Sequence, residues 1–226
     1  MSNTDSFIDE VTEEVRRDKL FGYLRRYGWI AVLAIVVIVG GASFNEYRKA
    51  QEEAKAQDLG DAMLAALNND AAEDRSAALA EINAETLEGM AVLALMQAGA
   101  FADAGDTDAA IAALQQVQTA ADAPLIYRQI ATFRALLLQS DTMDIAARRA
   151  GFQTLAVPGV PFRLLAEEQL ALIDIETGNV DAALDRLRPM LDDAEATAGL
   201  QRRALQAIVA LGGTFDDQSA DAATEN

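Results

Sequence analysis

The sequence predicts an all-α protein in which one apolar helix near the amino terminus is followed by an array of helix pairs. Three observations predict this fold class. Alanine is abundant and proline occurs only 4 times, so helix formers far outnumber helix breakers. Val, Ile, Thr and aromatic residues do not alternate with polar residues over any long stretch, which disfavours strands. A helix-turn-helix segment recurs later in the chain, which indicates internal repeats.

The chain starts with a tail, residues 1–26, that is rich in acidic residues. Residues 1–5 are predicted to be disordered. From Ser6 onward apolar residues recur near helical spacing, with acids first and bases last, the order that a helix dipole favours. We interpret this segment as an amphipathic helix that lies at a membrane interface. A docking or degradation tag for a partner protein is the alternative.

Residues 27–45 form an apolar run without a formal charge, which is typical of a transmembrane helix. The hydrocarbon core of a membrane requires about 20 apolar residues at about 1.5 Å each. We assign Trp29, Leu33, Val36 and Val39 to this span.

Two other interpretations of this run are open. A buried core helix is disfavoured because the chain has no second run of this kind to pack against it. A cleavable signal peptide would use the small residues at 40–42, but the preceding segment is long and acidic, unlike a short basic leader.

Lysine and arginine are more numerous before the apolar run than after it, and this difference predicts the orientation. The bases before it are Arg16, Arg17, Lys19, Arg25 and Arg26, and those after it are Arg48, Lys49 and Lys55. The amino terminus is therefore expected on the cytoplasmic side. In a bacterium the chain would be a single-pass inner-membrane protein with a periplasmic carboxyl-terminal domain.

The composition excludes several classes of function. The net charge is -18, and most of it follows the apolar run, so nucleic acid is an unfavourable partner. The chain has no His and no Cys, which removes disulfides, thiol nucleophiles, histidine bases and the usual zinc ligand sets. Gly-rich phosphate loops are also absent. We therefore expect no catalytic residue, no cofactor and no small-molecule substrate.

Asp103, Asp106 and Asp108 are the carboxylates that come closest to a metal site, because they lie in one turn. Oxygen ligands in a tight loop can bind calcium, but a calcium loop has about 12 residues and ends in a bidentate Glu that is missing here. These aspartates are better explained as helix caps or first-turn acids. We predict no metal site; an enzyme would require metal-dependent turnover that is lost when Asp103 or Asp106 is changed.

Residues 46–70 are predicted to form a helical stalk that enters the domain, residues 71–213. Acids and bases of the stalk can pair at three- and four-residue spacing. These residues are Lys49, Glu52, Glu53 and Lys55. A short helix follows, with Ala78, Leu79 and Ile82 facing inward. Residues 214–226 are predicted to be a disordered acidic tail.

The remaining helices are delimited by caps, glycines and prolines. Thr86 is a predicted cap, and so is the Asp141-Thr142 turn. Arg148 and Arg149 are predicted to face outward, and the acids near Asp193 to form a solvated helix end. The predicted helices are 87–104, 108–120, 124–139, 142–156, 161–177, 180–191 and 198–211.

Two helix-turn-helix segments can be aligned without a gap. The aligned pairs are Gly105 with Gly178, Asp108 with Asp181, Ala110 with Ala183, Ile111 with Leu184, and Leu114 with Leu187. Their separation is a little over two units of about 34 residues, the period of tetratricopeptide helix pairs.

The aligned segments resemble the tetratricopeptide family. The resemblance assigns the family's small residue of the first helix to Ala98 and Ala171, and the small residue that opens the second helix to Ala110 and Ala183. Small side chains allow two helices to cross closely, and Leu114 and Leu187 would fill the space against the next unit. Two features depart from the family. Asp174 replaces the aromatic residue that Phe101 provides in the first unit, and no proline closes either unit.

In this family the first helices of successive units line a concave groove. The resemblance therefore implies a partner-binding groove formed by Val92, Leu95, Gly99, Leu165, Glu168 and Leu172. The alternative is that the stalk or a neighbouring helix covers these positions as part of the core, since apolar residues at helical spacing are usually buried.

The whole layout, from acidic tail through span and charged stalk to an acidic helical array, resembles the YfgM-type ancillary proteins of the bacterial Sec translocon. This resemblance implies a periplasmic adaptor or chaperone for newly exported proteins. Its implied partners are the translocon channel, a periplasmic chaperone and exported chains. A structural scaffold for an envelope assembly complex, which binds one folded partner, is the alternative.

Overall fold

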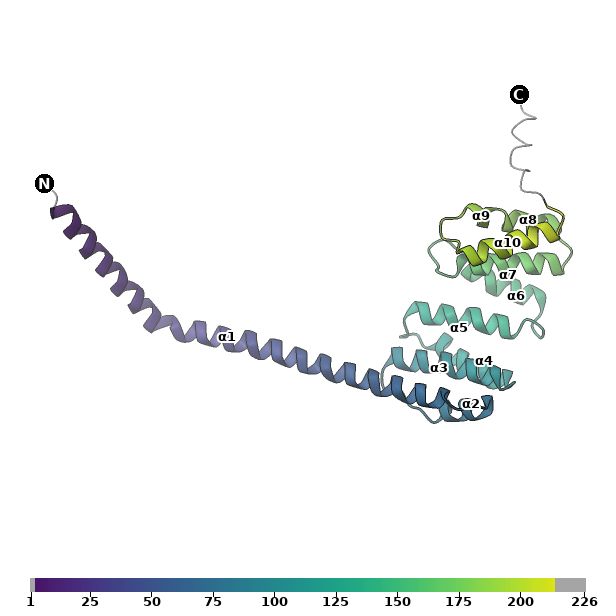
Figure 1. Ribbon diagram of the computed structural model, residues 1–226, viewed down its shortest axis with the longest axis horizontal. Coiled ribbons are helices and arrows are strands. Elements are labelled where there is room, and N and C mark those ends of the chain that lie inside the picture. Colours follow the sequence, from purple (N-terminus) through teal and green to yellow (C-terminus); the bar gives the residue numbers. More distant parts are fainter. Residues whose placement is uncertain (1–2, 214–226) are drawn as a thin grey trace, which may run out of the picture. The chain divides into compact units, whose positions relative to one another are not determined.

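The structure is a computed structural model that describes the backbone of residues 3–213 and the side chains of residues 26, 29, 30 and 33–213. Over the described backbone it is all-helical, without a strand, which confirms the predicted fold class (Figure 1). The chain divides into two units, Met1–Asp58 and Leu59–Asn226, which are considered separately. The predicted disordered tail, residues 214–226, lies outside the described residues.

Helix α1, Asn3–Leu67, is continuous through the predicted amphipathic tail, the apolar run and the stalk. The prediction that residues 3–5 are disordered is therefore wrong, and residues 1–2 lie outside the described part. In the stalk Arg48 pairs with Glu52 at 3.5 Å and Lys49 with Glu53 at 3.7 Å. The pair of Lys49 with Glu53 is one that the sequence predicts, whereas the pair of Arg48 with Glu52 is not; both have the four-residue spacing that stabilises a helix.

Among the side chains that the structure describes, no helix combines the length and the apolar character needed to cross a membrane. The predicted transmembrane helix at 27–45 is thus not supported. Side chains 27, 28, 31 and 32 lie outside the described set.

The second unit contains nine described helices after the end of α1. They are α2 Ala72–Ala80, α3 Leu87–Asp103, α4 Thr107–Thr119, α5 Leu125–Leu138, α6 Ile145–Leu155, α7 Arg163–Glu176, α8 Val180–Leu187, α9 Pro189–Asp192 and α10 Ala198–Ala210. Helices that follow one another in the chain are packed on one another, from α2 on α3 to α7 on α8 (Figure 1). This is the local packing of a repeat-like helical array.

Among the predicted helices of residues 87–211, two differ from the structure by three or more residues at a boundary. Helix α6 is capped by Asp144, whose carboxylate accepts hydrogen bonds from the backbone N–H of Ala146 at 2.8 Å and of Ala147 at 3.2 Å. The Asp141-Thr142 turn precedes this cap. The predicted helix 180–191 is divided into α8 and α9 at Pro189, which has no N–H to continue the helix.

Small buried side chains lie at the centre of each helix pair. Ala98, Ala110, Ala171 and Ala183 are completely buried, as the resemblance to tetratricopeptide helix pairs implies. Leu114 and Leu187 are also buried, one in the core of α3, α4 and α5 and the other in the core of α7, α8 and α10. A further cluster, centred on Phe152, joins α5, α6 and α7. The hydrophobic core of the array therefore runs from pair to pair.

The turn after the first helix is built in the same way in both aligned segments. Gly105 and Gly178 have φ of 81° and 76°, a conformation that is strained for residues with a Cβ. Beyond each glycine a backbone N–H returns to the helix, from Asp106 to the Phe101 carbonyl and from Asn179 to the Asp174 carbonyl, both at 2.8 Å. This is the Schellman arrangement of a helix C-terminus.

Replacing the turn glycines tests this geometry. Gly105→Ala and Gly178→Ala should each lower the free energy of unfolding by about 1 kcal/mol, because alanine is strained at positive φ. Gly60→Ala is the matched control. Gly60 lies within α1 with open space around its Cα, so alanine there should raise stability by about 0.5–1 kcal/mol. Urea unfolding followed by circular dichroism would measure both, and equal effects at the three sites would contradict the assignment.

Candidate protein-binding groove

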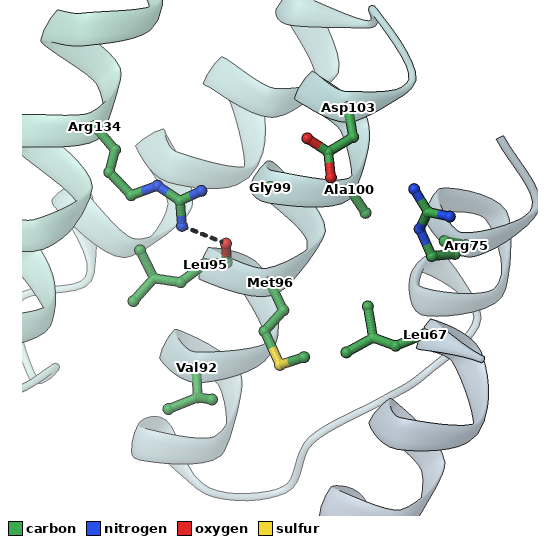
Figure 2. Close-up of a pocket in the computed structure, with 9 residues that line it drawn as sticks. All are labelled: Leu67, Arg75, Val92, Leu95, Met96, Gly99, Ala100, Asp103 and Arg134. Carbon is green, nitrogen blue, oxygen red and sulfur yellow. Dashed lines mark hydrogen bonds between the residues drawn. The ribbon is translucent and has the colours of Figure 1, made fainter. Parts of the chain in front are cut away.

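A pocket of about 320 Å³ lies on the face of α3 that the sequence assigns to a groove (Figure 2). Val92, Leu95 and Gly99 line it together with Met96. Their spacing of three and four residues places them on one face of the helix. Ala91, Ala94 and Ala98 of the same helix lie in the core shared with α4 and α5. Leu95 is buried and belongs to this core as well, whereas Val92, Met96 and Gly99 are half-buried, so the pocket floor lies directly on the core.

Arg134 of α5 forms one side of this pocket. Its guanidinium donates a hydrogen bond to the Leu95 carbonyl at 2.9 Å, shown as a dashed line in Figure 2. A Cβ placed on Gly99 would lie 3.2 Å from a terminal nitrogen of Arg134. Glycine is costly inside a helix, by about 0.5–1 kcal/mol relative to alanine. The close approach of the guanidinium gives a physical reason for glycine at this position.

Leu67 and Arg75 lie on the other side of the pocket (Figure 2). Arg75 donates hydrogen bonds from one terminal nitrogen to the carbonyls of Asn69 at 3.3 Å and Asp70 at 2.7 Å. These carbonyls belong to the turn between α1 and α2, so the turn and Arg75 hold each other in place. The pocket therefore has apolar walls and an arginine on each of two sides.

The other predicted groove residues, Leu165, Glu168 and Leu172, do not line this pocket. Leu165 is partly buried against the core of α7, α8 and α10. Glu168 accepts two hydrogen bonds from Arg203 of α10, at 2.6 and 2.8 Å, and these bonds raise the pKa of Arg203. Leu172 is exposed. The structure thus brings together the first three predicted residues but does not bring the second three into the same pocket.

Arg148 and Arg149 do not face outward, so that prediction is wrong. Arg148 is buried; it donates to Glu176 and, at 2.6 Å, to the Ser140 carbonyl. Arg149 donates to the buried carboxylate of Asp174 at 2.6 Å. Helix α6 packs on α7, and this packing turns both arginines toward the carboxylates of α7.

Asp174 is also bound by Arg186 of α8, whose Nε lies 2.9 Å from it. Arg186 donates a second hydrogen bond to Glu167 at 2.7 Å. Burial of Arg186 opposes its charge, but these hydrogen bonds outweigh burial and raise its pKa. Asp174, at the position that Phe101 occupies in the other aligned segment, thus joins α6, α7 and α8 through two arginines.

At the predicted solvated helix end of Asp192, Asp193 and Glu195, the structure leaves Asp192 and Glu195 exposed but also joins this end to α7. Arg163 donates to Asp193 at 2.7 Å and to Glu195 at 2.8 Å. Its hydrogen bond lowers the pKa of Asp193 below the ordinary value of 3.8. Because folding lowers the pKa of Asp193, this carboxylate stabilises the fold at pH values above its ordinary pKa. The contribution is lost as the pH falls through the folded-state pKa.

Asp106 caps α4 by accepting a hydrogen bond from the Ala109 N–H at 3.0 Å. Asp103 and Asp108 are exposed. Within the described side chains, no group of three or more Asp, Glu, His or Cys residues could hold a metal ion.

Sequence reasoning missed six residues of the pocket: Leu67, Arg75, Met96, Ala100, Asp103 and Arg134. Three of them come from α1, α2 and α5, which no periodicity within α3 can reveal. Gly99, a glycine inside a helix, was the one sequence signal that another group approaches closely there.

Comparisons of the chain with protein-family models, curated proteins and solved structures found no match. The functional interpretation therefore depends on the geometry of the described residues and on the layout of the sequence.

Removing the Asp174 charge tests whether its ion pairs hold the helices together. Asp174→Asn should lower the free energy of unfolding by about 3 kcal/mol, because it leaves Arg149 without its carboxylate partner and Arg186 with Glu167 alone. Glu195→Gln, which removes an exposed partner of Arg163, should change stability little. Urea unfolding of both variants is the measurement. A loss for Asp174→Asn no larger than that for Glu195→Gln would contradict the role assigned to this carboxylate.

Proposed function

We propose that the chain is a non-catalytic protein-interaction module and that the pocket on α3 is its binding surface. The observation that carries the proposal is the pocket itself, which combines an apolar floor with arginines on two sides. The all-helical, repeat-like fold fits a tetratricopeptide-type protein-binding module.

The groups around the pocket favour binding over bond cleavage. Its side chains are apolar except for Arg75, Arg134 and Asp103. Guanidinium groups donate hydrogen bonds but do not act as bases, and a lone carboxylate has neither a second carboxylate nor a histidine beside it in the pocket. Apolar walls with a few fixed polar groups can hold a side chain of a partner protein and orient its backbone.

We also propose that this module is anchored in a bacterial inner membrane through residues 27–45, with a cytoplasmic amino terminus and a periplasmic carboxyl-terminal domain. The uncharged run in the sequence and the excess of bases before it support the proposal. The described apolar side chains of the run are also exposed. Trp29, Leu33, Val36 and Val39 are more than half exposed, and leaving such side chains in water costs about 1.5–3 kcal/mol each relative to burial.

Within that setting the proposed role is that of an adaptor or chaperone beside the Sec translocon that assists newly exported proteins. The support is the resemblance of the layout to the YfgM-type proteins, together with a strongly acidic composition that keeps a tethered domain soluble. A scaffold for an envelope assembly complex uses the same pocket for one folded partner. The two roles differ in what occupies the pocket.

Site-specific photo-crosslinking in intact membranes separates these roles. A crosslinker at Val92, which is half-exposed in the pocket, should label several exported chains or a membrane-bound chaperone. The same crosslinker at Leu172 tests the exposed position on α7. Gln115, exposed on α4 and outside this pocket, is the control.

If Val92 labels only a single folded assembly component, the protein is a scaffold and not an adaptor or chaperone. Equal labelling from Val92 and Gln115 would show that the pocket is not the binding surface.

Membrane attachment has its own measurement. The full chain should stay with membranes during alkaline extraction, and protease added to sealed spheroplasts should degrade the part that follows residue 45. A variant with Val36→Asp and Val39→Asp should be released, because charges are unfavourable in a hydrocarbon core by about 2.5 kcal/mol or more each. Release of the unaltered chain, or a protected carboxyl-terminal domain, would exclude the proposed topology.

A further inference from the structure

Two arginines of the pocket have no carboxylate partner, although the chain has twice as many acidic as basic residues, 36 against 18. In the part of the chain that the structure describes, five arginines of α6, α7, α8 and α10 bind carboxylates, whereas the exposed Arg202 of α10 does not; the five are Arg148, Arg149, Arg163, Arg186 and Arg203. Within the described residues, Arg75 and Arg134 instead hydrogen-bond only to backbone carbonyls. Both of these lie at the pocket on α3, so the two guanidinium charges there remain uncompensated by an ion pair.

The backbone contacts hold both guanidinium groups in fixed positions. Arg134 is attached to the Leu95 carbonyl and passes over Gly99, and Arg75 is attached to the turn after α1. A guanidinium carries five N–H donors, and each of these contacts uses one terminal nitrogen, so several donors on each side remain available. Arginine held in this way can bind a carboxylate with little further loss of side-chain entropy.

Between the two arginines the pocket offers apolar side chains, with Leu67 and Met96 facing the space in Figure 2. Methionine adapts to different apolar shapes. Asp103 also lines the pocket and forms no ion pair with either arginine. The negative charge of Asp103 disfavours a partner's carboxylate at that end of the pocket. A partner's carboxylate is therefore favoured only close to Arg75 or Arg134.

We propose that this pocket selects internal segments of partner proteins in which a large apolar side chain stands beside Asp or Glu. The apolar side chain contacts Leu67 and Met96, and the acidic side chain accepts hydrogen bonds from Arg134 or Arg75. This inference rests on the proposed protein-binding function and adds its selectivity. Charge complementarity carries it, since a basic segment would meet two arginines at close range.

Three fluorescent peptides, blocked at both ends so that no terminal charge contributes, test the selectivity against the full chain purified in mild detergent. The first contains Leu flanked by Asp, the second has Lys in place of Asp, and the third has Ser in place of Leu. Fluorescence anisotropy should show that the first peptide binds about tenfold more tightly than each of the others, the effect expected of a hydrogen bond to a charged group or of one buried apolar side chain.

Arg134→Gln and Arg75→Gln should each weaken binding of the first peptide about tenfold and reduce its salt dependence. Arg202→Gln is the matched control, because Arg202 is exposed on α10, outside the pocket, and the substitution removes the same charge. Circular dichroism shows whether each variant keeps its helices. If one of the two pocket variants does not fold, the other still tests the proposal.

Equal binding of the Asp and Lys peptides, or an equal loss for Arg202→Gln and Arg134→Gln, would overturn the selectivity. If Val92 still crosslinks to proteins in that case, the binding function stands without it. If no peptide binds and Val92 captures nothing, the binding function fails and the selectivity with it.

Discussion

The close crossing of paired helices is the constraint on which the rest of this structure depends. It is made possible by four alanines, Ala98, Ala110, Ala171 and Ala183, none of which is accessible to solvent. A larger side chain at any of them would separate the axes of a helix pair and displace the leucines packed around it. Close crossing also means that each pair has a thin core of its own, so the pairs must pack on one another to bury enough apolar surface.

Ion pairs replace apolar packing at one buried position of the array. In the first of the two aligned helix-turn-helix segments the position before the turn is aromatic, Phe101, whereas in the second segment it is Asp174. The carboxylate is buried and would be unfavourable alone, but α6 and α8 each supply an arginine within hydrogen-bond distance. Because both arginines bind Asp174, neither is available to a ligand. The α6–α8 region is consequently a structural part of the domain, and the pocket lies elsewhere.

The sequence predicted the helical elements and the positions of closest packing because both depend on local chemistry. Turn glycines, Thr86 as a cap and the spacing of small residues act within a few residues, and the structure places them accordingly. The first half of the predicted groove also lies on one face of α3 for the same reason. The errors concern charged residues: Arg148, Arg149 and Asp193 were expected in solvent, and each has a partner on another helix.

What the sequence determined by itself was the all-helical fold, the close-packed positions of the two aligned units, and the absence of histidine and cysteine chemistry. Only the tertiary structure decided which charges are paired. A helix face shows which residues share a side, but the partner of an arginine 25 or more residues away depends on how helices stack. For this reason Arg149 and Arg134, both on helix faces of an acidic chain, have different roles: one is neutralised by Asp174 and the other remains at the pocket, attached to a backbone carbonyl.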